Sequence, residues 1–193
     1  MIIRRSPEAK TAQRLFNYDD SVGRYLKEHA DSFYLQTRDV WRWNSRYWEQ
    51  VALLHLAHYF RRPNTSEGLA SLTESVQHAR HAVSVELHPF PLSTLGKVLM
   101  TQMLVKGMSK SAIYDEAFQK LEQAIDLESS WARIAPQPYA SLFSGTAKYL
   151  EAGGELNSNQ LTKVRRFMDE AERKFARDTE IKGNLDMVRG ALL

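Results

Sequence analysis

The chain has 193 residues, a length that suits one domain or a short array of repeats. With 43% hydrophobic residues, 25% charged residues and a formal net charge of +3, it has the composition of a soluble globular protein. It contains no cysteine, which excludes disulfides, cysteine-ligated zinc and thiol catalysis. The basic start has no apolar stretch behind it, and no stretch approaches the roughly 20 apolar residues of a membrane span, so we expect a cytoplasmic protein without a secretory signal.

Charge is unevenly distributed along the chain. Residues 1–62 contain 11 Lys and Arg against 7 Asp and Glu, a net charge of +4, whereas residues 111–160 contain 3 against 7, a net charge of −4. A basic front and an acidic third quarter suit end-to-end self-association, or an acidic partner at the front. A solvated surface without a partner explains the same pattern, and the sequence leaves these explanations open.

The pattern of apolar residues predicts an all-α fold. Apolar residues recur at spacings of three and four along the chain, and strand-like alternation is absent. After an N-terminal extension over residues 1–18, we expect helices over residues 19–37, 41–60 and 66–86, in a single domain that covers residues 19–193. Pro63 ends the second of these helices, and Ser66 is the expected cap of the third.

Proline and glycine mark the remaining helices. We expect a fourth helix over residues 92–105 behind Pro91, a fifth over 111–127, a sixth over 139–152, a seventh over 158–177, and a short eighth to the end of the chain that Gly183 and Gly190 weaken. The residues expected to face the core from the third and fifth helices are Leu69, Leu72, Val76, Ala79 and Val83, and Ile113, Ala117, Leu121, Ala124 and Ile125.

Two segments repeat each other at a distance of 42 residues. Residues 76–86 and 118–128 share Gln, Ala and Glu at equivalent positions and carry apolar residues at four others. Periods of about 20–50 residues with helix–turn–helix content are typical of a helical solenoid. A weaker repeat of the pattern lies at residues 168–172, about 47 residues further on.

The repeated segments resemble the tetratricopeptide (TPR) repeat. Its second helix carries a small residue, a large apolar residue and Ala, as do Ala117, Leu121 and Ala124, and its first helix carries Leu-Gly, as at Leu95-Gly96 behind a proline. The resemblance implies antiparallel helix pairs stacked as a right-handed solenoid of seven to eight helices. The period departs from the roughly 34 residues of the family. Residues 33–36 and the Leu95-Gly96 pair also resemble the C-terminal repeat regions of bacterial STAND-type NTPases and sirtuin-associated defence proteins.

The TPR resemblance implies a non-catalytic scaffold that holds a protein or peptide partner, acidic in character, in a concave groove lined by the first helix of each pair. Alignment on Gly96 places in this groove Lys97, Met100 and Thr101, with Trp48, His55, His58 and Tyr59 one repeat earlier and Ser144 and Lys148 one repeat later.

Residues 38–48 form the most unusual stretch of the sequence. They hold three tryptophans and three arginines, and we add Arg42 and Arg46 to the partner-binding residues. Interleaved Arg and Trp side chains also suit a nucleic acid, whose bases stack on aromatic rings. A third explanation places Trp41 or Trp48 in the junction between the first helices, with the arginines in solvent.

Catalytic and metal-binding alternatives have weaker sequence support. Arg24 and His29 have the Arg-x4-His spacing of the HEPN-like helical ribonucleases, whose Arg stabilises charge and whose His transfers a proton. The pairs His55/His58 and His78/His81 have a spacing that presents two imidazoles to a metal, but neither has an accompanying Glu-x-x-His motif. We therefore expect no catalytic residue, no metal site and no cofactor.

Overall fold

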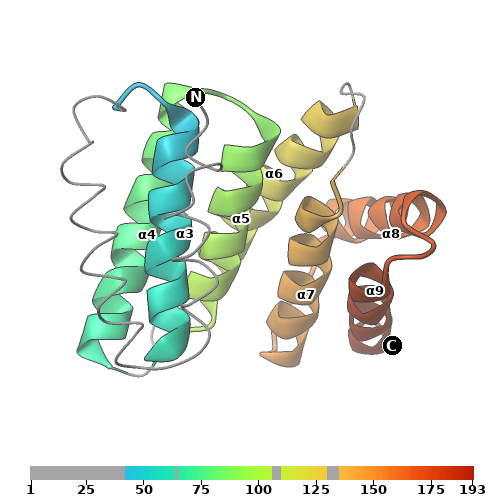
Figure 1. The fold of residues 1–193 in the computed structure, drawn as a ribbon. Coiled ribbons are helices and arrows are strands. Elements are labelled where there is room, and N and C mark those ends of the chain that lie inside the picture. Colours follow the sequence, from blue (N-terminus) through green and yellow to red (C-terminus); the bar gives the residue numbers. More distant parts are fainter. Residues whose placement is uncertain (1–41, 64, 106–109, 130–134) are drawn as a thin grey trace. The chain divides into compact units, whose positions relative to one another are not determined.

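A computed structural model describes residues 42–63, 65–105, 110–129 and 135–193 of the chain. Every regular element in these residues is an α-helix, which confirms the all-α class (Figure 1). The predicted first helix, residues 19–37, and the N-terminal extension lie outside the described residues. The chain divides into two compact units, Met1–Leu87 and His88–Leu193. The single domain predicted over residues 19–193 stays a prediction.

The described part of the first unit is a helical hairpin. Its helices are α3 (Ser45–Arg61) and α4 (Ser66–Val85), which pack side by side (Figure 1). The Asn44 side chain caps α3, and Thr65 Oγ1 accepts a hydrogen bond of 3.0 Å from the Gly68 amide to cap α4. The cap of α4 is therefore Thr65, one residue before the predicted Ser66. A buried hydrogen bond of 2.7 Å from Ser75 Oγ to the Ala52 carbonyl oxygen ties the two helices together.

The described residues of the second unit form five helices whose ends follow local signals. Pro89 and Pro91 lie in the first turn of its first helix, where a missing amide costs nothing. Gly153 ends the third with φ +80°, a left-handed conformation that favours glycine. Asn157 and Gln160 form a capping box at the start of the fourth. The helices are α5 (Pro89–Met103), α6 (Lys110–Ser129), α7 (Gln137–Glu151), α8 (Ser158–Lys174) and α9 (Thr179–Ala191).

Within the second unit, α5 packs against both α6 and α7, and α7 has its closest packing partner in α9 rather than in α8. Helix α8 runs crosswise to α7 and α9 in Figure 1. Ion pairs join α8 to α6: Lys163 Nζ lies 2.6 Å from Glu122 Oε1, and Arg166 lies 3.5 Å from Asp126 Oδ1. The chain therefore pairs α7 with a helix that is not its neighbour in sequence.

The predicted core positions are largely confirmed. All of the predicted α6 residues are buried except Ile113, which is partly buried beside the fully buried Tyr114. On α4, Leu72, Val76 and Ala79 are buried. The inward position predicted for Leu69 is wrong, because this residue is 39% exposed. Gly68 faces inward instead, where a Cβ atom would clash with the Arg62 carbonyl group.

Large side chains fill the interior of each unit. The fully buried ones are Tyr47 in the first unit and, in the second, Tyr114, Tyr139, Phe143, Phe167, Leu92, Leu95, Leu99, Met103, Leu121, Leu142 and Ile181. Among the described helices, none combines the length and the apolar character that crossing a membrane requires.

Candidate functional site

Three polar side chains meet across the α3–α4 hairpin. We call them the histidine cluster: His55 comes from α3, and Glu74 and His78 come from α4. Glu74 and His78 are four residues apart, so they lie one above the other on the same face of α4. The packing of α3 against α4 brings His55 to that face.

The ligand atoms of the histidine cluster lie within 4.8 Å of one another. Glu74 Oε2 is 3.7 Å from His78 Nε2 and 4.0 Å from His55 Nε2. The two imidazole rings stack with their centroids 5.2 Å apart. The imidazoles are largely covered, with side-chain exposures of 15% for His55 and 25% for His78, whereas the Glu74 side chain is 54% exposed. The cluster thus has an open side at its carboxylate.

Trp48 supports the histidine cluster from the core of the hairpin. Its indole is 6% exposed, packs with Tyr47 and Val51, and donates a hydrogen bond of 2.9 Å from Nε1 to the Arg42 carbonyl oxygen. Its ring stacks on His78 at 5.4 Å. The predicted partner-binding residue Trp48 is therefore placed inside the hairpin, while Arg42 is exposed and Arg46 forms an ion pair of 2.8 Å with Glu49.

His58 and Tyr59 of α3 are also placed in the interior. His58 Nδ1 shares a hydrogen bond of 2.7 Å with Ser71 Oγ, and His58 Nε2 lies 3.6 Å from Glu67 Oε1. Tyr59 is 9% exposed. His58 therefore contacts Ser71 and Glu67 of α4 and does not join the histidine cluster. The second imidazole of the cluster belongs to His78 of α4, and not to His58 as the spacing within α3 suggested.

The remaining predicted residues lie on α5 and α7 of the second unit. Lys97 and Lys148, which we call the lysine pair, are exposed, and Ser144 is partly exposed. Met100 and Thr101 are buried, and Met100 packs so tightly against Gly145 that a Cβ atom there would lie 2.6 Å from Met100 Cγ. No carboxylate of the described residues forms an ion pair with either member of the lysine pair.

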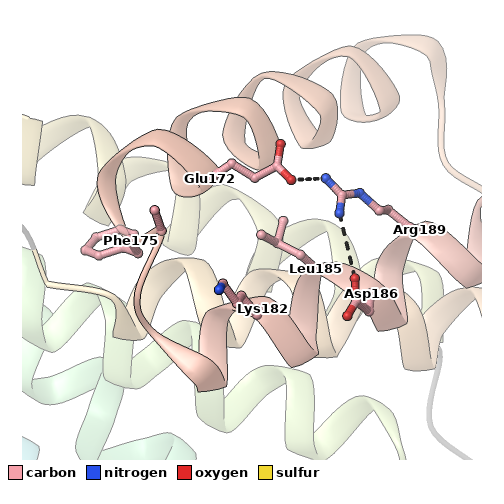
Figure 2. A pocket seen from close by; sticks show the side chains of 7 residues that line it. Glu172, Phe175, Lys182, Leu185, Asp186 and Arg189 are labelled. Atoms are coloured by element: carbon pink, nitrogen blue, oxygen red, sulfur yellow. Dashed lines mark hydrogen bonds and ion pairs between the residues drawn. The ribbon is translucent and has the colours of Figure 1, made fainter.

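A small, half-open cleft of about 380 Å³ lies between the end of α8 and α9. Figure 2 shows Arg189 between the carboxylates of Glu172 and Asp186, with which it forms ion pairs. Phe175 and Leu185 supply apolar surface, and Lys182 lies at the edge. Arg189 and Lys182 together balance the charges of Glu172 and Asp186, so the cleft offers no strong site for a charged ligand.

The sequence contained one signal for the histidine cluster that a search for Glu-x-x-His did not detect. Glu74 and His78 have the i,i+4 spacing that places two ligands on one helical face. Their third partner, His55, depends on the register between α3 and α4, which is a tertiary property. Arg24, His29 and the first part of the Arg/Trp stretch lie outside the described residues.

Comparisons of the chain with models of protein families, with curated proteins and with solved structures gave no match.

Proposed function

We propose that the chain is a non-catalytic, cytoplasmic interaction module that binds an acidic segment of a protein partner at two exposed lysines, Lys97 of α5 and Lys148 of α7. The observation that carries the proposal is the lysine pair. Lys97 is the single charged residue of α5, and α7 carries only Lys148 and Glu151. Both lysines are exposed and have no ionic partner in the described part of the chain.

Three cations of α8 provide a contrast. On α8, Lys163, Arg166 and Lys174 each lie within 4.0 Å of a carboxylate. A lysine that is already paired gives up an existing interaction when a partner arrives, whereas the lysine pair gains a new charge-assisted hydrogen bond. Ser141 and Ser144 of α7 are partly exposed and add uncharged donors, which suit an acidic peptide or a terminal carboxylate.

The resemblance to TPR repeats supports the same surface. In such solenoids the first helix of each pair lines the binding face, and α5 and α7 correspond to first helices in the alignment on Gly96. The contact between Gly96 of α5 and Leu121 of α6 supports a TPR-like pairing of these two helices, because a small residue there allows close approach. We propose that the helix pairs stack in this manner.

The test compares the full chain with a Lys97→Glu/Lys148→Glu variant in pull-downs from native lysate, washed at low and at moderate salt. We expect a discrete protein that the unmodified chain retains at both salts and that the double variant loses. Lys182→Glu is the matched control, because it makes the same charge reversal at an exposed lysine on α9.

Two outcomes contradict the proposal. If the double variant retains the protein as well as the unmodified chain does, the lysine pair does not contribute to binding. If only nucleic acid is recovered, and it is lost as the salt concentration rises, the partner is a nucleic acid and not a protein. Residues 38–48 are then the expected binding residues.

A further inference from the structure

We propose that His55, Glu74 and His78 bind a divalent transition-metal ion, Zn²⁺, and that the bound ion links α3 to α4. This site lies outside the surface of the proposed function and does not depend on it. From the sequence we consider only pairs of histidines within one helix and expect no metal site. The proposed site combines residues from two helices.

The geometry of the histidine cluster is close to that of an occupied site. Bonds of about 2.0–2.2 Å in a tetrahedral arrangement place neighbouring zinc ligands roughly 3.3–3.5 Å apart. The Glu74 carboxylate oxygen lies 3.7 Å from His78 Nε2 and 4.0 Å from His55 Nε2. All three ligand atoms lie within 4.8 Å of one another, so side-chain rotations that bring them up to about 1.5 Å closer would reach coordination distance.

The chemical nature of the three ligand atoms indicates which metal ions the site prefers. Two imidazole nitrogens and one carboxylate oxygen suit Zn²⁺ and other late first-row ions, whereas Mg²⁺ and Ca²⁺ prefer oxygen ligands throughout. Three protein ligands leave a fourth tetrahedral position for water. Glu74 is the exposed member of the cluster, so an ion would reach the ligands from the side of this carboxylate.

The surroundings hold the ligands in place. The His78 ring stacks on Trp48 at 5.4 Å and on His55 at 5.2 Å. Trp48 is itself fixed by burial and by its hydrogen bond to the Arg42 carbonyl oxygen. All three ligands stand on helices rather than on loops, and rigid elements give a site its precision.

The consequence of binding is a cross-link between helices that are joined otherwise by side-chain packing and a few hydrogen bonds. An ion that binds the folded hairpin, and binds the unfolded chain more weakly, shifts the folding equilibrium toward the folded form by mass action. Zinc is therefore expected to raise the thermal stability of the first unit.

The experiment titrates the metal-free full chain with ZnCl₂ by calorimetry and follows thermal unfolding in parallel. We expect one Zn²⁺ per chain and a higher melting temperature. His55→Gln and His78→Gln are each expected to weaken binding by at least tenfold, since even changes to the surroundings of a ligand cost about 10–100-fold. His81→Gln is the matched control, because His81 lies on the same helix and contacts Trp48 but is outside the cluster.

Absence of binding to the unmodified chain would overturn the proposal, as would binding that His55→Gln and His78→Gln leave unchanged. Glu74→Gln guards against a variant that fails to fold, because a half-exposed carboxylate can be replaced without loss of packing. Circular dichroism confirms folding, and retained affinity in a folded Glu74→Gln chain also counts against the site. Lys97→Glu/Lys148→Glu leaves zinc binding unchanged, so failure of the proposed function and failure of the metal site are distinguishable.

Discussion

At Gly96, α5 lies directly against a side chain of α6. A Cβ atom at this position would lie 2.7 Å from Leu121 Cδ2 and closer still to Leu121 Cγ, and Leu121 is fully buried. Alanine favours a helix over glycine by about 1 kcal/mol, but overpacking a core costs roughly 1–3 kcal/mol. The two effects together lead us to expect that Gly96→Ala lowers the free energy of unfolding by up to about 2 kcal/mol in urea denaturation, and a stabilised variant would contradict the close contact.

At Gly183, another glycine within a helix, we expect substitution by Ala to stabilise the fold. It is exposed in the interior of α9, and a Cβ atom there meets no heavy atom within 4 Å. Substitution by Ala therefore removes backbone entropy from the unfolded chain without introducing strain. We expect Gly183→Ala to raise the free energy of unfolding by about 0.5–1 kcal/mol, measured under the same denaturation conditions as Gly96→Ala. Destabilisation would show that α9 is not helical at this residue.

At the scale of helices, Tyr114 joins α6 to α7. Its hydroxyl shares a buried hydrogen bond of 2.9 Å with Thr146 Oγ1, and its ring stacks on Tyr149 at 4.0 Å. Tyr114→Phe and Thr146→Val each leave one buried hydroxyl without this partner, whereas the double variant removes both. In a double-mutant cycle we expect a coupling of about 0.5–1.5 kcal/mol. Additive effects would show that the hydrogen bond contributes nothing to the packing of the two helices.

The same phenol makes the stability of this contact depend on pH. Burial raises the pKa of Tyr114 above its ordinary value of 10.0, although the hydrogen bond to Thr146 opposes the shift. The unfolded chain therefore releases this proton at lower pH than the folded chain does, and stability that is present below about pH 10 is lost as the pH rises further. We expect the stability advantage of the unmodified chain over Tyr114→Phe to be constant up to about pH 9 and to shrink as the pH rises above about 10. An advantage independent of pH would contradict the burial of this group.

Helix positions were predicted well because the signals that end a helix are local. Pro91, Pro138 and the Gly153-Gly154 pair act through their own backbone conformations, so α5 and α7 begin and end within a few residues of the expected positions. The first turn of α4 was harder to predict, because the Arg62 carbonyl group lies against Gly68, and this contact depends on the tertiary fold. The histidine cluster could not be predicted, since His55 and His78 are brought together by the register between two helices.

At the scale of the whole molecule, the division into two compact units predicts that the second unit folds alone. The described part of residues 88–193 forms five helices with their own buried core, and domains of this size are common. We expect a fragment of residues 88–193 to unfold in one cooperative transition, followed by circular dichroism and by tyrosine and tryptophan fluorescence. A non-cooperative transition would show that its core is incomplete without the first unit.

The effect of zinc on thermal unfolding is expected to differ between the two units. The described part of the first unit is a hairpin of two helices around a small core that includes Tyr47, Trp48, Val51 and Ala82. Small units bury too little apolar surface for high stability, and a bound metal is one of the ways in which such units are stabilised. We expect ZnCl₂ to raise a transition of the full chain and to leave the melting temperature of the 88–193 fragment unchanged, because His88 is the single histidine of that fragment and lies outside the histidine cluster. An equal rise in both would place the bound zinc in the second unit.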